Sequence, residues 1–206
     1  GGAAALVFAS GMSAATACFL ALAPGDHVIA PKVMYWSLRN WLLNFATHWG
    51  LVVEFVDADS IEAVRQAVKP GKTKMIWLET PANPLWCISD IAACAKIAHD
   101  AGALLAVDST CATPVFTRPI EHGADLVMHA ATKYLAGHSD VMAGALVGAR
   151  DDEHWKRIRL IRAQLGTILG ALESYLLLRG MRTLFPRVRT PPTTPSGWRA
   201  SWRPIR

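Results

Sequence analysis

A lysine in an unusual setting is the first feature of the sequence that points to chemistry. The stretch HAATKYLAGHSD, residues 129–140, places Lys133 after small apolar residues and before a turn that contains glycine, histidine and aspartate. No Asp, Glu, Arg or second Lys lies within four positions of Lys133 on either side. Surface lysines usually have charged neighbours, so a lysine without them is a candidate for chemistry.

Three other apolar stretches also end in polar groups. Ser10 precedes Gly11 and Met12 at the start of an expected helix, whose free N–H groups suit an anion; an ordinary helix cap is the alternative. Asn83 lies between two prolines, where an ordinary turn residue is the alternative. Asp108 ends an apolar run, and a carboxylate buried there requires a cationic partner.

Asp108, Lys133 and an anion site fit two interpretations. Pyridoxal phosphate requires a lysine for a Schiff base, a carboxylate that keeps its pyridine nitrogen protonated, and an anion site for its phosphate. A buried structural ion pair between Asp108 and Lys133 explains the same two residues equally well. His129 and His138 flank the lysine, but no third ligand has suitable spacing, so we expect no metal site.

Strand and helix patterns alternate along the chain. We expect strands at 5–10, 27–31, 51–57, 73–80, 104–110, 124–131 and 144–148, and helices at 11–23, 34–50, 60–68, 89–102 and from 151 to about 181. Continuous apolar strands separated by helices predict an α/β fold with a mostly parallel sheet covered on both faces. Ligands of such sheets bind at the carboxyl ends of the strands, where the polar residues described above lie.

Composition narrows the class of protein. Hydrophobic residues make up 52% of the 206 residues and charged residues 18%, which is typical of a folded domain, and no apolar run is long enough to span a bilayer. Residues 186–206 hold five arginines and no acid; the other 16 basic residues match 16 acidic ones, so we expect no nucleic-acid partner. Scattered cysteines and the lack of a signal-peptide pattern favour a cytoplasmic protein.

Six segments between residues 4 and about 185 carry a resemblance to a known family. They are FASGMSAA, LAPGDHVIAP, LETPANPL, VDSTCATP, HGADLVMHAATKYLAGHSDVMAGALVG and LLLRGMRTL. Together they resemble the Cys/Met-metabolism, or transsulfuration, family of pyridoxal-phosphate enzymes, which includes cystathionine synthases and lyases, methionine γ-lyase and O-acyl-homoserine sulfhydrylases. The resemblance implies an aspartate-aminotransferase-like (type I) fold and pyridoxal 5'-phosphate as the cofactor.

The resemblance implies catalytic roles for two residues. Lys133 resembles the lysine that forms the Schiff base with the cofactor and then moves protons on the substrate. Tyr35 resembles the tyrosine that stacks on the cofactor ring and assists proton transfer or departure of the leaving group. Asp108 resembles the carboxylate that pairs with the pyridine nitrogen.

Further cofactor contacts are implied by the same resemblance. Gly11 and Met12 resemble the backbone pair that binds the phosphate, and Thr132 resembles the hydroxyl that binds it. Asn83 resembles the side chain that contacts the ring hydroxyl, and Thr110 resembles the residue that packs under the ring.

The resemblance gives two further positions a different interpretation. Glu79 is expected to be structural. Ala130 stands where the family usually has serine, two residues before the threonine of the lysine motif. This departure implies the loss of one phosphate hydrogen bond, at a cost of about 1–3 kcal/mol.

The resemblance also implies a domain organisation. Residues 1–150 would form the large cofactor-binding domain without its N-terminal arm, and residues 151–185 a helical connection towards a C-terminal domain that is largely missing. Residues 186–206 would be an irregular basic tail. Members of the family form dimers within tetramers, with active sites between subunits, so we expect a homo-oligomer.

Two hypotheses for function follow from these expectations. The first is an enzyme that performs β- or γ-elimination or γ-replacement on sulfur amino acids or O-acyl-homoserine, with Lys133 as the base. The second is a catalytically inactive remnant, or a non-catalytic subunit that pairs with a full-length homologue.

Overall fold

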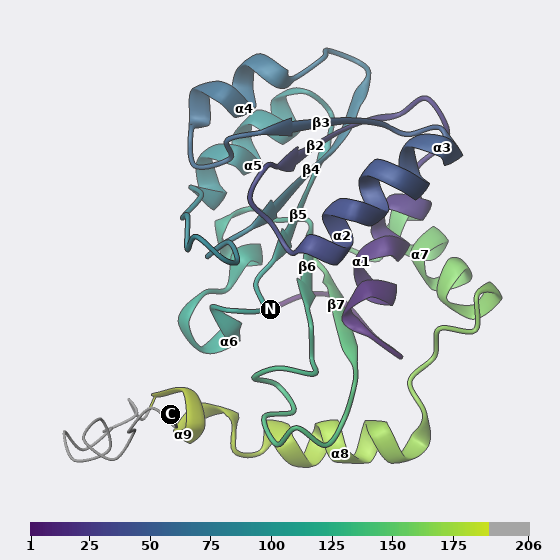
Figure 1. The fold of residues 1–206 in the computed structure, drawn as a ribbon, viewed down its shortest axis with the longest axis vertical. Coiled ribbons are helices and arrows are strands. Elements are labelled where there is room, and N and C mark those ends of the chain that lie inside the picture. The colour runs from purple at the N-terminus through teal and green to yellow at the C-terminus, as the bar shows by residue number, and fades with distance from the viewer. Residues whose placement is uncertain (190–206) are drawn as a thin grey trace, which may run out of the picture.

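A computed structural model describes residues 1–189, which form one seven-stranded sheet with helices on both faces (Figure 1). The strand order is β1-β7-β6-β5-β4-β2-β3. The strands are β1 (Ala4–Phe8), β2 (His27–Pro31), β3 (Val52–Val56), β4 (Thr73–Glu79), β5 (Leu104–Asp108), β6 (Leu126–His129) and β7 (Gly144–Gly148). Strand β7 runs antiparallel to both of its neighbours, β1 and β6, and the other described strand pairs are parallel, which confirms the predicted mostly parallel sheet.

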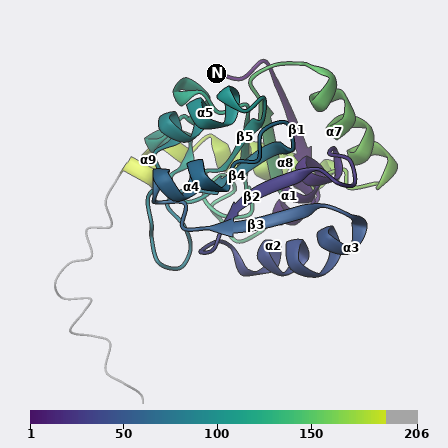
Figure 2. The ribbon, with the colours of Figure 1, turned by 90° about the horizontal axis from the view of Figure 1, so that it is seen from above.

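Helices connect most of the strands and cover both faces of the sheet. They are α1 (Gly11–Leu20), α2 (Trp36–Trp41), the π-helical η1 (Leu42–Ala46), α3 (Thr47–Trp49), α4 (Ile61–Ala67), α5 (Ile91–Asp100), α6 (Thr113–Phe116), the 3₁₀ turn η2 (Pro119–His122), α7 (Glu153–Gln164), α8 (Ala171–Met181) and α9 (Leu184–Arg189). Helices α1, α2 and α7 pack in one core, and α4 and α5 pack in another. Figure 2 shows α5 and α2 on opposite sides of the sheet.

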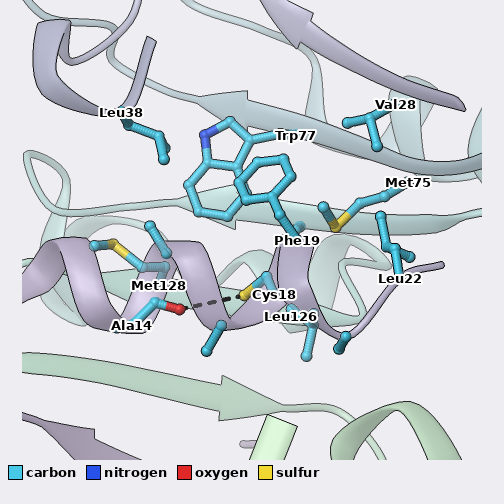
Figure 3. Packing of buried hydrophobic residues seen from close by; sticks show 14 of the residues in the cluster. Ala14, Cys18, Phe19, Leu22, Val28, Leu38, Met75, Trp77, Leu126 and Met128 are labelled. Carbon is cyan, nitrogen blue, oxygen red and sulfur yellow. Dashed lines mark hydrogen bonds between the residues drawn. The ribbon is translucent and has the colours of Figure 1, made fainter. Parts of the chain in front are cut away.

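Small side chains in the core between α1 and the sheet allow the two to pack closely. Ala14 and Cys18 let α1 approach the sheet closely, and both are buried (Figure 3). Phe19 packs against Trp77 of β4, with 5.1 Å between the ring centroids. Burial raises the pKa of the Cys18 thiol, whose Sγ donates to the carbonyl oxygen of Ala14 at 3.5 Å. This thiol is therefore a core group, as its apolar sequence context indicates.

Side-chain caps explain where three further helices begin. Helices α4, α5 and α7 follow Ser60, Asp90 and Asp152, and each of these side chains accepts a hydrogen bond from the amide three residues later. Such caps satisfy an amide that has no partner inside the helix, and each stabilises the helix by about 1 kcal/mol. The helices that flank the sheet are thus anchored at their first turns.

The C-terminal part of the described chain differs from the prediction in two ways. The expected helical region from 151 to about 181 is divided, because Gly166 adopts a φ of +64° between α7 and α8. The expected irregular tail from 186 is wrong for residues 186–189, which complete α9. The remainder of that tail, 190–206, lies outside the described residues. Within 1–189 no helix is both long and apolar enough to cross a membrane.

Candidate active site

The sheet brings the predicted residues to one edge. Strands β4, β5 and β6 are parallel neighbours, and Asp108 lies in register with Glu79 on one side and Met128 on the other. Strand β1 runs in the same direction as β6, because β7 between them is antiparallel to both. The segments that follow β1, β2, β4, β5 and β6 therefore meet at the carboxyl edge, where ligands of α/β sheets bind.

Asp108 is a buried carboxylate held from one side only. Its Oδ1 accepts hydrogen bonds from the amide of Thr110 at 3.0 Å and from Thr110 Oγ1 at 2.5 Å. Thr110 Oγ1 in turn accepts from the amide of Ala130 at 2.7 Å, which joins the ends of β5 and β6. Burial raises the pKa of Asp108 to about 6, although the Thr110 hydrogen bonds oppose this shift. Both bonds go to Oδ1, so Oδ2 is left for a donor from a ligand.

Glu79 holds two of the predicted site residues by their backbones. Its Oε2 accepts from the amide of Tyr35 at 2.6 Å, and its Oε1 accepts from the amide of Asn83 at 2.8 Å. Burial, followed by the nearby charge of Asp108, raises the pKa of Glu79 to about 7. The predicted structural role is thus a specific one: Glu79 fixes the loops that carry Tyr35 and Asn83. Its place at the last residue of a buried strand was the only sequence signal for it.

The side chains of Tyr35 and Asn83 are free to face a ligand. Tyr35 is 45% exposed, and Asn83 is also exposed. Neither side chain makes a hydrogen bond to another described residue, whereas both backbones are fixed by Glu79. This combination suits side chains that contact a bound molecule, because the backbone is fixed before binding.

The amino terminus of α1 has backbone amides free to bind an anion. Ser10 Oγ accepts from the amide of Ser13 at 3.0 Å, and the carbonyl of Ser10 accepts from the amide of Ala14. The first amides of the helix, Gly11 and Met12, have no acceptor in the described part of the chain. These two amides and the helix dipole favour a bound anion such as a phosphate.

Two glycines allow the anion site to form next to the lysine segment. A Cβ on Gly11 would lie 3.0 Å from the Cβ of Ala130. A Cβ on Gly144 would lie 2.1 Å from the carbonyl oxygen of Ser10. At position 144 only glycine fits without displacing the backbone of Ser10, which precedes α1. At position 11 the lack of a side chain lets α1 lie against Ala130, at the end of β6.

Lys133 is exposed and its amine is unpaired among residues 1–189. Its amide donates to the carbonyl of Ala130 at 3.0 Å, which begins a tight turn after β6. No hydrogen bond or salt bridge from the described residues reaches Nζ, and none joins Lys133 to Asp108. The alternative of a buried structural Asp108–Lys133 ion pair is therefore wrong.

Thr132 does not present a free hydroxyl to the site. Its Oγ1 donates to the carbonyl of Ala143 at 3.1 Å and accepts from the amide of Ala143 at 2.9 Å. A hydroxyl has one proton to donate, so a phosphate could take it only if the side chain released Ala143. The hydroxyl instead ties the lysine turn to the start of β7, and its role towards phosphate stays a prediction.

These residues fit pyridoxal phosphate in charge and in hydrogen-bonding capacity. Asp108 has a free oxygen for a protonated ring nitrogen, and no cation from residues 1–189 pairs with it. The amides of Gly11 and Met12 suit a phosphate, and Lys133 offers an unpaired amine. Groups of three or more His, Cys, Asp or Glu side chains that could hold a metal ion do not occur in the described residues.

A mostly parallel sheet with a lysine, a carboxylate and free helix amides at its carboxyl edge offers the groups that a pyridoxal-phosphate protein needs. Residues 1–194 match the family described as Cys/Met metabolism PLP-dependent enzymes. The chain therefore belongs to this family, as the six sequence segments predicted.

Relatives with stated functions carry several reaction names. The chain is 43% identical over 185 residues to a probable cystathionine gamma-synthase of Herpetosiphon aurantiacus, covering 90% of this chain and 57% of that protein. It is 42% identical to the cystathionine gamma-lyase of Bacillus subtilis, covering 89% and 48%, and 43% identical to the L-methionine gamma-lyase of Treponema denticola, covering 85% and 44%. The chain thus spans about half the length of the curated relatives it matches.

A solved structure agrees with the sequence relatives. Cystathionine gamma-lyase from Lactobacillus plantarum, solved in complex with L-serine, superimposes with a TM-score of 0.86 at 39% identity, covering 89% of this chain and 48% of that one. The predicted type I fold is confirmed by this agreement.

Proposed function

We propose that this chain is the cofactor-carrying part of a PLP-dependent transsulfuration enzyme, with Lys133 as the attachment lysine. The observation that carries the proposal is a continuous path of contacts at the sheet edge. Glu79 holds the backbone of Tyr35 and lies in register with Asp108, and Thr110 links Asp108 to Ala130. The carbonyl of Ala130 accepts from the amide of Lys133.

Each end of this path has a distinct task. Pyridoxal phosphate, when bound, supplies an electron sink for the carbanion that remains after an amino acid loses its α-proton. Asp108 would accept a hydrogen bond at its free Oδ2 and so favour the protonated form of the ring nitrogen. Lys133 carries an exposed amine, which can form the covalent attachment and, once released, hold and move a proton.

The loops above the carboxylates orient the remaining contacts. Tyr35 and Asn83 have fixed backbones and exposed side chains, so they can contact a ring and its substituents without a large ordering cost. The amides of Gly11 and Met12, which have no acceptor among the described residues, would hold the phosphate.

The substrate class is proposed from the relatives. Their names cover cystathionine and methionine lyases and cystathionine synthases, which supports a sulfur amino acid or O-acyl-homoserine as substrate, with elimination or replacement at the β or γ carbon. A homo-oligomer in the cytoplasm is part of the same proposal. The inactive remnant and the non-catalytic subunit are the alternative hypothesis.

An absorbance titration of the purified chain with pyridoxal 5'-phosphate tests the proposal. We expect a visible band that borohydride removes by fixing the carbon–nitrogen linkage, and a labelled peptide that contains Lys133. Lys133→Ala should abolish the band and the label. Lys96→Ala is the matched control, because Lys96 is an exposed lysine on α5 whose amine pairs with Asp100 of the same helix.

The outcome separates the two hypotheses. A band that depends on Lys133 supports the enzyme and justifies assays with cystathionine, methionine and O-acyl-homoserine. A folded chain, shown by circular dichroism, that gives no band or is labelled equally on other lysines contradicts the proposal and favours the inactive alternative.

A further inference from the structure

Arg187 of α9 makes a set of contacts that composition alone did not predict. Its Nη1 donates to the carbonyl of Tyr134 at 2.8 Å, and its Nη2 donates to the carbonyl of Leu135 at 3.5 Å. Nη2 also donates to the carbonyl of Gly180 at 2.8 Å, and Nε donates to Thr183 Oγ1 at 3.0 Å. In the sequence this arginine was one of five in a basic tail.

Two of the three carbonyls that Arg187 contacts, those of Tyr134 and Leu135, belong to the turn that carries Lys133. The amide of Lys133 donates to Ala130, and the amide of Gly137 donates back to the carbonyl of Lys133 at 2.8 Å, which closes the turn. No backbone amide in the described chain donates to the carbonyls of Tyr134 or Leu135. They resemble the unpaired carbonyls at the end of a helix, which a guanidinium satisfies with charge-assisted bonds.

Close packing places the guanidinium over this turn. Gly137 has a φ of +75°, and a Cβ there would lie 2.0 Å from Nη1 of Arg187. A Cβ on Gly180 would lie 2.1 Å from the carbonyl oxygen of Ala136, so α8 meets the same turn directly. Both glycines are thus required for this approach of backbone and side chain.

An apolar cluster supports the same contact. Leu135 and Ala136 of the turn are buried together with Leu177 of α8 and Leu184, the first residue of α9. Val7 of β1 and Ala145 of β7 pack against the same cluster. The lysine turn is therefore held between the sheet and residues 177–187.

We propose that Arg187 is a positioning residue for Lys133, and that it fixes the turn of residues 130–137 so that the amine stays at the sheet edge. The proposal rests on the proposed function for its consequence, which is efficient attachment of pyridoxal phosphate to Lys133. The effect of Arg187 on the stability of the turn can be measured without the cofactor.

The test compares Arg187→Ala and Arg187→Lys with a matched control, Arg189→Ala. Arg189 lies on the same helix, but its guanidinium lies over the ring of Phe185 and makes no hydrogen bond to the lysine turn. Amide hydrogen exchange over residues 131–137 is measured in the free chain. The rate of borohydride-fixed labelling of Lys133 by pyridoxal 5'-phosphate is measured in parallel.

We expect Arg187→Ala to speed exchange in residues 131–137 by about tenfold or more and to slow Lys133 labelling several-fold, because two or more charge-assisted bonds are lost. Arg187→Lys keeps the charge without the planar fork and should give intermediate values. Arg189→Ala should match the wild type in both measurements. If Arg187→Ala does not fold, the same two measurements on Arg187→Lys, compared with Arg189→Ala, test the proposal.

Two results would overturn the proposal. In one, folded Arg187 variants exchange as slowly as Arg189→Ala. In the other, exchange is faster but Lys133 is labelled at the wild-type rate, so that the contact is structural only. A wild-type chain that does not take up pyridoxal 5'-phosphate contradicts the proposed function, and the exchange measurement then decides alone whether Arg187 holds the turn.

Discussion

The carboxyl ends of β4 and β5 each bury an acid, and the two acids are used differently. Both carboxylate oxygens of Glu79 accept hydrogen bonds inside the protein, from the amides of Tyr35 and Asn83. Asp108 receives both of its hydrogen bonds from Thr110 at a single oxygen. They are register partners on neighbouring strands, and both have raised pKa values. The first acid therefore builds the site, and the second is left partly unsatisfied for a ligand.

The difference has a physical reason in the local backbone. The loop after β4 turns back over its own strand end, which brings the amide of Asn83 to Glu79. Thr110, two residues beyond Asp108, contacts one side of its carboxylate and then reaches across to β6. A buried carboxylate with a free oxygen is unfavourable unless a cation arrives, which is a pattern found at functional sites.

The largest expected effect is on cofactor binding by Asp108→Asn. Removing one partner of a buried charge pair costs roughly 3–5 kcal/mol, so the affinity for pyridoxal 5'-phosphate should fall by more than about 100-fold. Titration by visible absorbance measures it. Asp57→Asn, at an exposed acid that pairs with Lys32, is the control. An affinity within a few-fold of wild type would show that Asp108 is not the partner of the cofactor.

The second expected effect is a pH dependence of stability that comes from the same two acids. Their pKa values in the folded chain, about 7 and about 6, lie above those of the unfolded chain, so the folded state binds more protons. Their contribution to stability is fully present below about pH 4 and is lost as pH rises towards 7. By linkage the loss is roughly 3 kcal/mol for each of the two acids.

Urea unfolding of the cofactor-free chain at several pH values measures this dependence. The double variant Glu79→Gln with Asp108→Asn should lose the fall in unfolding free energy between pH 5 and 8 that the wild type shows. An identical slope in both proteins would mean that neither acid is protonated preferentially in the folded state.

The third expected effect is a difference in unfolding free energy between variants of the two acids. Glu79→Ala removes the acceptors for two backbone amides, and we expect the free energy of unfolding at pH 5 to fall by about 2 kcal/mol. Asp108→Asn keeps an acceptor for Thr110 and should not lower stability. Glu62→Ala on the exposed face of α4 is the control for the substitution. Equal losses for Glu79→Ala and Asp108→Asn would remove the distinction between the two acids.

The same contrast shows what the sequence can and cannot predict. The end of a strand can be predicted from an apolar run and the turn-forming residues that follow it, so the positions of Asp108 and Lys133 at one edge were predictable. The partners of each polar group depend on loops from distant parts of the chain. Sequence patterns do not reveal that Glu79 holds Tyr35 across 44 residues, or that the Thr132 hydroxyl is occupied by Ala143.

The misassigned tail has a similar origin. Arginines followed by prolines have the composition of an irregular segment, and residues 186–189 were assigned to it for that reason. A single side chain, Arg187, gains contacts with three carbonyls that belong to two other segments, and α9 extends to Arg189. Tertiary contacts of this kind override local composition.

The smallest expected effect is a gain, from Ala130→Ser. The Cβ of Ala130 lies 3.0 Å from the position a Cβ would take on Gly11, so a hydroxyl added at 130 lies beside the free amides of α1. One more donor to a phosphate should tighten binding of pyridoxal 5'-phosphate by about five- to tenfold. Competition by inorganic phosphate should strengthen in parallel, which assigns the gain to the anion site rather than to Lys133. Ala92→Ser on α5 should change neither value, and an Ala130→Ser variant that also changes neither would place the phosphate away from residue 130.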